Sequence, residues 1–495
     1  MGRIIFNEDP NHFIYSRYTA GYKSITEKDC EDFILQYKDT DITDFMICVN
    51  ASVTWYDCSC EKNIISQYRE YCKSDKKLSH IHNTEYIGLL ADFYDRYKKV
   101  PQDIWIETLR KIGVRPWTSI RMNDIHESDL PDSILFSDFY RANRKKNRAS
   151  HRGAAGYYEY GLDYTYEEVR KHYLEIIEDA LRRFDTDGLE LDWMREIYSV
   201  GIGKEHEGTT VINRFMRDVY VLVKDIEKVR GHNISIAVRL PDTPEKALRL
   251  GFDAFDWVEN GLVDMITVTP RWSSVDNDLP IDIWKKTFRG KPVCIAAGLE
   301  ILLDAYNRKG RKYVFNTFET AISSACAYLY QGADAIYLFN YMDKYVDYCT
   351  GEAGKKFFKT VGNYERCIAE KRRHILTYND VSAIGVPQKK PLPAKIFRGE
   401  YAAFRIVTGE IPQGRNASII LGIEAGSEFN ASALSVYASA RKCIFADEIP
   451  PAPLQYTDMR YFAFNIKNDG SLPPGSVIEI GGADCILHWL EIDII

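Results

Sequence analysis

The sequence predicts an α/β protein, a (β/α)8 TIM barrel followed by a small all-β sandwich. Over the first 350 residues, short β-rich runs alternate with stretches of helical periodicity, and eight such runs occur. Further along, the helical stretches give way to short alternating runs separated by turn residues, which is typical of a sandwich. The 495 residues also exceed the size of one ordinary domain.

The barrel elements are predicted from these runs and from the helical stretches between them. The strands are expected at Arg3–Asn7, Asp44–Asn50, Val114–Asn123, Gly188–Trp193, Asn233–Arg239, Asp264–Thr269, Pro292–Ala297 and Ala335–Asn340. The clearest helices are expected at Tyr166–Phe184, Val211–Val229, Pro244–Val258 and Arg311–Gln331. Right-handed crossovers make all the strands parallel, so their C-terminal ends meet at one mouth.

The predicted domains are the barrel over residues 1–375, a linker over 376–395 and the sandwich over 396–495. Pro387, Pro391 and Pro393 mark the linker. The sandwich strands are expected at Tyr401–Val407, Ser418–Ile423, Ala433–Ala438, Arg460–Ile466, Val477–Glu479 and Cys485–Ile494. We expect this domain to cover the side of the barrel, with sugar binding as the alternative.

Composition excludes several classes of partner and predicts the compartment. The net charge of −7 argues against a nucleic-acid partner, which needs a basic face. No run approaches 18 apolar residues, so no membrane partner is expected. The N-terminus has no apolar signal core, which predicts a cytoplasmic protein or one whose export signal was removed. The sequence leaves open whether the protein forms a homo-oligomer.

The 11 cysteines indicate free thiols in a reducing compartment, because their number is odd and most lie in apolar runs. Cys58 and Cys60, with Cys72 further on, form the one pattern that could ligate a metal. A matching second pair is missing, so no metal and no other cofactor is predicted.

Carboxylates of two strands are the candidate catalytic groups. Barrel enzymes place their chemistry at the C-terminal mouth, and side chains alternate between lumen and helices along each strand. On the fourth strand, Glu190 and Asp192 take the lumen-facing positions, and on the seventh the same alternation reaches Glu300. Glu190 lies one layer deeper, so it either substitutes for a catalytic carboxyl or holds the barrel together through an arginine.

Polar side chains at other strand ends are the candidate substrate-binding groups. They are Asn7, Asn50, Arg121, Asn123, Arg195, Arg239, Arg271, Asn340 and Tyr341. Trp272 follows the sixth strand and would either stack on a sugar face or only pack against the barrel. His126 is near the mouth and is interpreted as a loop histidine rather than a base.

A ring of carboxyl, guanidinium and amide groups suits hydrolysis of a glycosidic bond. One carboxyl protonates the departing oxygen, and the other attacks the sugar carbon or activates a water. Asp192 and Glu300 are the predicted pair. The chain has no G-x-S-x-G elbow, P-loop, dinucleotide fingerprint or H-E-x-x-H, which argues against the enzyme classes that use them.

Several segments resemble a known family. SIRMNDIH (119–126), DTDGLELDWMRE (185–196) and GADAIYLFN (332–340) are similar to glycosyl-hydrolase-like barrel proteins of the family 10-like, DUF187-type group, which are bacterial. The resemblance implies a hydrolase of carbohydrate metabolism acting on an oligo- or polysaccharide.

Two further similarities bear on the catalytic groups. DGLELDW resembles the strand-four motif of family 18 chitinases, but Met194 stands where those enzymes hold their acid, which argues against their mechanism. The large retaining barrel clan has an acid/base on strand four and a nucleophile on strand seven. Asp192 and Glu300 occupy comparable places.

Two other functions remain open at this point. The first is a non-catalytic carbohydrate-binding barrel, which predicts that Asp192 and Glu300 are far apart or held in salt bridges. The second is a metal-assisted lyase or isomerase acting on a sugar acid, which predicts a cation bound by Glu190 and Asp192.

Overall fold

A computed structural model of the chain describes most of its residues. The described residues are 2–74, 84–127, 133–146, 160–270, 274–306, 308–310, 314–342, 346–378, 389–467 and 472–495. Arg271 and Trp272, two of the candidate substrate-binding residues, lie outside them.

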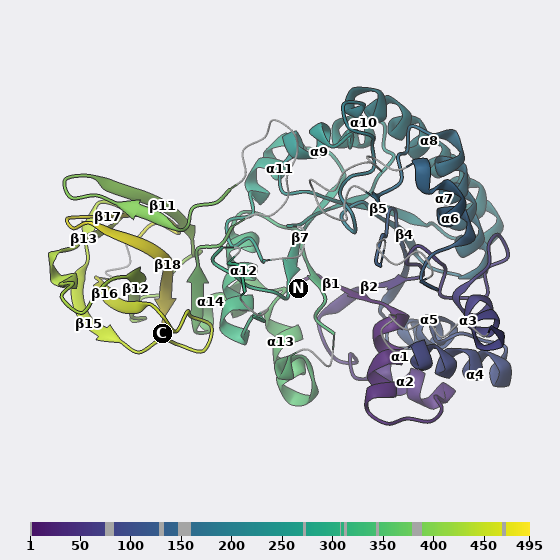
Figure 1. Cartoon of the computed structure of the whole chain (residues 1–495), viewed down its shortest axis with the longest axis horizontal. Helices are drawn as coiled ribbons and strands as arrows, with labels where there is room; N and C mark the ends of the chain where they lie inside the picture. The colour runs from purple at the N-terminus through teal and green to yellow at the C-terminus, as the bar shows by residue number, and fades with distance from the viewer. Residues whose placement is uncertain are drawn as a thin grey trace.

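Eight parallel strands close into a barrel in sequence order, which confirms the predicted fold class (Figure 1). They are β1 (Ile4–Glu8), β2 (Ile42–Cys48), β3 (Arg115–Arg121), β4 (Gly188–Asp192), β5 (Ser235–Leu240), β6 (Met265–Val268), β7 (Cys294–Glu300) and β8 (Ala335–Phe339). β8 pairs with β1, with Tyr337 opposite Ile5, and this pairing closes the barrel. Each predicted strand overlaps one of these eight.

Helices form the outer layer. They are α1 (Pro10–Thr19), α2 (Glu27–Leu35), α3 (Ile64–Lys73), α4 (Ile87–Tyr97), α5 (Pro101–Lys111), α6 (Asp138–Asn143), α7 (Glu167–Arg183), α8 (Glu205–Arg230), α9 (Pro244–Arg249), α10 (Ala254–Glu259), α11 (Ile281–Thr287), α12 (Phe318–Tyr330), α13 (Gly351–Thr360) and α14 (Tyr364–Ala369). Among these described helices, none combines the length and the apolar run that a membrane span requires.

Two predicted helices differ from the observed ones. The helix expected over Pro244–Val258 is two helices, because Gly251 between them takes a φ of +95°, in the left-handed region. The helix expected from Arg311 begins only at Phe318, where the hydroxyl of Thr317 caps it by accepting from the Thr320 amide.

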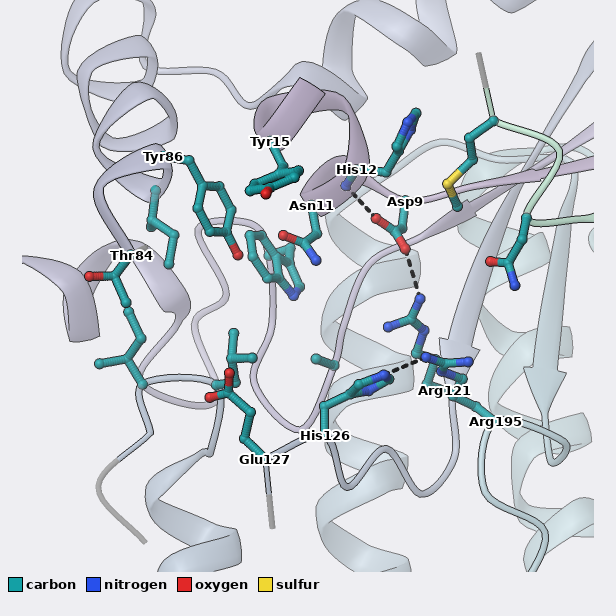
Figure 2. A pocket seen from close by; sticks show the side chains of 17 residues that line it. Asp9, Asn11, His12, Tyr15, Thr84, Tyr86, Arg121, His126, Glu127 and Arg195 are labelled. Carbon is teal, nitrogen blue, oxygen red and sulfur yellow. Dashed lines mark hydrogen bonds and ion pairs between the residues drawn. The ribbon is translucent and has the colours of Figure 1, made fainter. Parts of the chain in front are cut away.

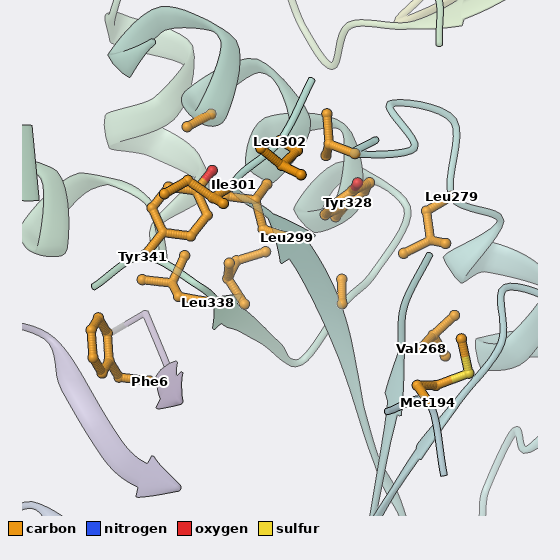
Figure 3. Packing of buried hydrophobic residues seen from close by; sticks show 14 of the residues in the cluster. Phe6, Met194, Val268, Leu279, Leu299, Ile301, Leu302, Tyr328, Leu338 and Tyr341 are labelled. Atoms are coloured by element: carbon orange, nitrogen blue, oxygen red, sulfur yellow. The ribbon is translucent and has the colours of Figure 1, made fainter. Parts of the chain in front are cut away.

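The strand side chains alternate between two apolar layers. Leu189 and Leu191 of β4 belong to the large cluster beneath the helices, as their predicted orientation requires. Figure 3 shows the same layer beside β7 and β8, where Leu299 and Leu338 lie near Tyr328 of α12. The lumen is filled by a separate cluster: Ile5, Met46, Trp117, Ala237, Met265, Ala296, Ala335, Tyr337 and Phe339. The barrel is therefore a packed core with polar groups confined to its ends.

The C-terminal region is formed by two antiparallel sheets, which confirms the predicted sandwich. One has the order β10-β18-β12-β16-β15 with β9 also on β18, and the other β11-β17-β13-β14. The strands are β9 (Arg372–Ile375), β10 (Ala394–Ile396), β11 (Tyr401–Val407), β12 (Ala417–Glu424), β13 (Ser435–Ala438), β14 (Arg441–Lys442), β15 (Ile444–Ile449), β16 (Arg460–Ile466), β17 (Gly475–Gly481) and β18 (Cys485–Ile494). β9 falls inside the range predicted for the barrel domain, although it pairs with β18.

Polar contacts attach these sheets to the side of the barrel, next to α12 and α14 in Figure 1. The Tyr306 hydroxyl lies 2.7 Å from Nδ1 of His488. The hydroxyl of Tyr456 donates to Asp304 over 2.9 Å. The strand β9 also packs on α12. The sheets therefore cover part of the helical layer and also reach the loop that follows β7, since Asp304 and Tyr306 lie four and six residues beyond Glu300.

Gly188 tests the packing of the lumen. A Cβ atom at this position would lie 2.1 Å from the Trp117 ring, and Trp117 is 1% exposed. We expect Gly188→Ala to lower the free energy of unfolding by about 1–3 kcal/mol, measured by urea unfolding. Gly426→Ala is the matched control, because no atom lies within 4 Å of its added carbon. Equal unfolding midpoints for the two variants would contradict the described packing.

Candidate active site

A cavity of about 390 Å³ opens at the C-terminal side of the barrel, beside the ends of β1, β2, β3, β4 and β8. Asp9, Arg121, His126, Arg195 and Asn340 supply much of its polar lining. Figure 2 shows Tyr15 and Tyr86 along one wall, facing the arginines across the cavity. Aromatic faces opposite hydrogen-bonding groups are the general composition of a small-molecule site.

The first turn of α1 holds Asp9 at the cavity. Asp9 is the N-cap, its Oδ1 accepts from the His12 amide at 2.6 Å, and Pro10 occupies the first helical position. Its other oxygen accepts from Arg121 at 2.8 Å. Burial alone would raise the pKa of Asp9, but the Arg121 charge, the His12 amide and Arg195 together lower that pKa below its ordinary value.

Arg121 connects two carboxylates. Besides Asp9, its guanidinium donates to Asp124 over 3.0 Å. Burial opposes the charge on Asp124, but His126, Arg121 and Arg195 hold its pKa well below the usual range. Asn50 braces the same strand end, accepting from the Arg121 amide at 2.9 Å and donating to the Arg121 carbonyl at 3.0 Å. Asn50 therefore positions β3 by bonding its backbone.

His126 continues this network toward Arg195. Its Nδ1 lies 2.8 Å from Asp124 and its Nε2 lies 2.6 Å from an Arg195 nitrogen. A guanidinium only donates, so Nε2 accepts and the imidazole proton resides on Nδ1, facing Asp124. Burial lowers the pKa of His126, and Arg195 lowers it further, against the effect of Asp124. The neutral ring thus links a carboxylate to an arginine.

A second polar group lies in the upper lumen, where the register of the barrel places Asp192 opposite both Arg121 and Arg239. Asp192 accepts from Arg239 at 2.7 Å, and both side chains are buried. The Arg239 guanidinium also lies 4.0 Å from the centre of the Phe339 ring. Asp192 and Arg239 therefore form a buried ion pair between β4 and β5.

Glu190 lies one layer deeper on the same strand. One of its oxygens accepts from Ser119 at 2.6 Å and from Tyr337 at 3.0 Å. Burial, followed by the nearby charge of Asp192, raises the pKa of Glu190 to about 7. Glu190 therefore bonds hydroxyl groups of β3 and β8.

Glu300, at the end of β7, connects the lumen to the cavity through Asn340. Its Oε1 accepts from the Ile301 amide at 2.9 Å and from the Asn340 side chain at 3.2 Å, and Asn340 lines the cavity. Burial raises the pKa of Glu300 to about 8. Arg239 acts electrostatically on both Glu300 and Asp192, so carboxyls of β4 and β7 share this arginine as a neighbour.

Several buried polar atoms around these groups have no hydrogen-bond partner in the described part of the chain. Among the described residues, the buried atoms without a partner include four of the upper lumen: Glu190 Oε1, Glu300 Oε2, Thr267 Oγ1 and Arg239 Nε. Buried polar atoms are almost always hydrogen-bonded in native proteins, to water or a ligand if not to the chain. The upper lumen therefore has donors and acceptors to offer a bound hydroxylated molecule.

The remaining predicted residues lie elsewhere. Asn7 is buried at the end of β1. Asn123 bonds the backbone of Leu162 and Tyr198, so it braces loops. Tyr341 is fully buried and stacked on Phe357, in the layer of helices. Its hydroxyl donates to the Glu300 carbonyl over 3.4 Å, so Tyr341 braces the end of β7 from the helical side.

Sequence reasoning missed several residues of the cavity wall. Asp9 has the same orientation as Asn7, two residues earlier, so extending the first predicted strand would have found it. Glu127 follows β3 in a loop, and Tyr86 lies in the short helical turn before α4. These residues lie outside the strands, so the alternation of side chains along a strand could not predict them. Among the described residues, three close metal-ligating side chains occur at Cys58, Cys60 and Asp179, which are not part of the cavity lining.

Comparison with known proteins leaves the family open. No family model matches the chain, and no curated protein does. Similar solved structures include alpha-L-fucosidase isoenzyme 1 from Paenibacillus thiaminolyticus, with 13% identity over 98% of this chain and 97% of that chain and a TM-score of 0.36. The glycoside hydrolase domain of PgaB (BpsB) from Bordetella bronchiseptica has 11% identity over 73% of this chain and 99% of that chain, with a TM-score of 0.42.

Two further structures are similar in the same range. A family GH18 chitinase from Chromobacterium violaceum has 8% identity over 100% of this chain and 88% of that chain, with a TM-score of 0.39. The chain spans 57% of a cycloisomaltooligosaccharide glucanotransferase from Paenibacillus sp., at 10% identity over 99% of its own length and a TM-score of 0.33. TM-scores below 0.5 give no basis for transferring a function, and the resemblance to the DUF187-type group stays a prediction.

The protonation of Glu300 predicts a pH-dependent stability. Its pKa is near 4.5 in an unfolded chain and about 8 in the fold, so between these values the folded state binds one more proton. The stabilisation that this extra proton gives to the folded state is present at low pH and is lost as the pH rises through 8. Glu300→Gln removes the cost of ionisation, so its stability relative to wild type should rise by on the order of 3 kcal/mol from pH 5 to pH 8. Urea unfolding at both pH values measures this, and an equal difference at both would show that Glu300 is ionised throughout.

Proposed function

We propose that this protein is a glycoside hydrolase whose catalytic carboxyls are Glu300 and Asp192. The observation that carries the proposal is the different surroundings of the two carboxyls: burial raises the pKa of Glu300 to about 8, which keeps it a neutral acid near pH 7, while Asp192 is ion-paired with Arg239. Two carboxyls held in different protonation states by their surroundings are what acid-assisted cleavage of a glycosidic bond requires.

In this mechanism Glu300 is the general acid. Its proton passes to the glycosidic oxygen as the bond to the anomeric carbon breaks, so the leaving group departs as a neutral alcohol. Oε1 is held by the Ile301 amide and Asn340, while Oε2 has no partner in the described part of the chain. The free oxygen is therefore the one that would carry the proton to a substrate.

Asp192 is the ionised partner. It either attacks the anomeric carbon or takes a proton from the attacking water, and its negative charge stabilises the oxocarbenium-like transition state. Arg239 fixes its orientation through the 2.7 Å bond. These roles are the reverse of those implied by the retaining barrel clan, because burial acts more strongly on the carboxyl of β7.

The cavity would bind the rest of the saccharide. Asn340 lies on the cavity wall and donates a hydrogen bond to Glu300. A sugar bound beside Asn340 would therefore be separated from the acid by that one side chain. Asp9, Arg121 and Arg195 offer hydrogen bonds to hydroxyl groups, and Tyr15 and Tyr86 offer ring faces. Oligo- or polysaccharides are the proposed substrates.

One observation favours the non-catalytic carbohydrate-binding barrel as the second candidate. Asp192 is held in a buried salt bridge, and Glu190, Asp192 and Glu300 are each at most 2% exposed. A protein of this kind would bind the same saccharides in the cavity without cleaving them. Measured hydrolysis separates the two candidates.

We expect Glu300→Gln and Asp192→Asn each to lower kcat by about 100-fold or more on an aryl glycoside that the wild type cleaves. Loss of the acid should matter less for a dinitrophenyl leaving group, which departs without protonation, so Glu300→Gln should recover on that substrate and Asp192→Asn should not. Glu352→Gln, whose side chain is 91% exposed, is the control and should keep wild-type kinetics. Full activity in both carboxyl variants would refute the assignment.

A further inference from the structure

Two cysteines and an aspartate meet on the outside of the barrel. Cys58 and Cys60 lie in the loop between β2 and α3, and Asp179 lies on α7, 120 residues further along the chain. One ligand atom from each of the three lies within 4.8 Å of the others, and the two sulfur atoms are 3.0 Å apart. Cys72 is not a member of this group.

The cluster is held in place by a well-bonded loop. The Ser59 amide donates to the carboxylate of Asp179 over 3.1 Å, and the Ser59 hydroxyl bonds the same oxygen. Next to Cys58, Asp57 pairs with Arg183 of α7 at 2.9 Å, and Arg183 in turn binds Asp103. Both sides of the group are therefore positioned before any ligand arrives, which favours a specific site.

A buried hydroxyl group also lies beside the cluster. Tyr56 is 0% exposed, and its hydroxyl lies beside both Cys58 and Asp179, with which it interacts. Donors next to thiolate and carboxylate ligands commonly orient them around a metal ion.

We propose that Cys58, Cys60 and Asp179 bind a divalent metal ion of the zinc class, which fastens the loop after β2 to α7. Two thiolates and a carboxylate are ligands that Zn²⁺ prefers, and water would complete a tetrahedral set. Bonds of about 2.3 Å at tetrahedral angles place two sulfurs about 3.8 Å apart. The observed 3.0 Å opens to this value by rotation of Cys60, which is exposed.

The ion would stabilise the loop after β2, which forms part of the cavity wall. Ala51 and Trp55 belong to the same loop and line the cavity. The loop is already joined to the barrel by the Trp55 amide, which donates to the Val49 carbonyl at 2.8 Å. A metal on Cys58 and Cys60 adds a second attachment three residues beyond Trp55. Its role is structural, and it takes no part in the proposed hydrolysis.

Titration of the reduced, metal-stripped full-length chain with Cd²⁺ tests the site. We expect one equivalent to bind and to produce the ultraviolet charge-transfer band of a cadmium thiolate, and one equivalent of Zn²⁺ to displace it. Zn²⁺ should also protect Cys58 and Cys60 from alkylation in peptide mass spectrometry, while Cys72 stays reactive. The loading should raise the Tm.

Variants on the exposed side of the cluster complete the test. Cys60→Ser and Asp179→Ala should each lower Cd²⁺ affinity by on the order of 100-fold and abolish the Tm increase, with an unchanged circular dichroism spectrum showing that they fold. Cys72→Ser is the matched control and should bind as the wild type does, because Cys72 is also exposed.

Two results would overturn the proposal. One is Cd²⁺ binding of equal strength in the wild type and in Cys60→Ser. The other is a Cys58–Cys60 disulfide, rather than a metal, in protein purified without reductant. Hydrolytic activity is not a readout here, so failure of this site leaves the proposed function untouched.

Discussion

The closure of eight parallel strands into one barrel determines where this chain can place charge. β1 pairs with both β2 and β8, so each strand has two neighbours and its side chains face either the lumen or the helices. Both layers are apolar over most of their depth, and a charge is tolerated in them only with a partner. Asp192 meets that condition through Arg239, which approaches it from the adjacent strand at the same level.

The same constraint keeps the second carboxyl neutral. Glu300 also faces the lumen, but its hydrogen bonds come from an amide and an asparagine, and its nearest cation is already paired with Asp192. Without a counter-ion of its own, burial favours its protonated form. One arginine, paired with Asp192 and only a neighbour of Glu300, thus accounts for the different surroundings of the two carboxyls.

Much of this arrangement could be predicted from the sequence. Strand alternation is a local property, so it placed Glu190, Asp192 and Glu300 in the lumen and Leu189 and Leu191 under the helices. The edge strand β15 escaped prediction because its side chains are mostly exposed and show no alternation. The break at Gly251 in the helix predicted over Pro244–Val258 was missed because helical periodicity continues on both sides of it.

The rest of the site depends on contacts between distant segments. The cavity wall combines the start of α1, the loop after β3 and the turn before α4, and no spacing rule relates these segments. The protonation of Glu300 follows from its burial beside an arginine already paired with Asp192, which only the assembled barrel reveals. Likewise, the sequence alone does not indicate that Cys58 lies close to Asp179, because the two residues are far apart along the chain.

Direct titration of the Glu300 carboxyl is the sharpest test of this account. In ¹³C NMR spectra of protein labelled at the glutamate carboxyls, the Glu300 resonance is identified by its loss in Glu300→Gln. The account predicts that this carboxyl remains protonated at pH 7 and titrates near pH 8. A resonance already ionised at pH 6 would contradict it, because Glu300 would then have no proton to give to a leaving group.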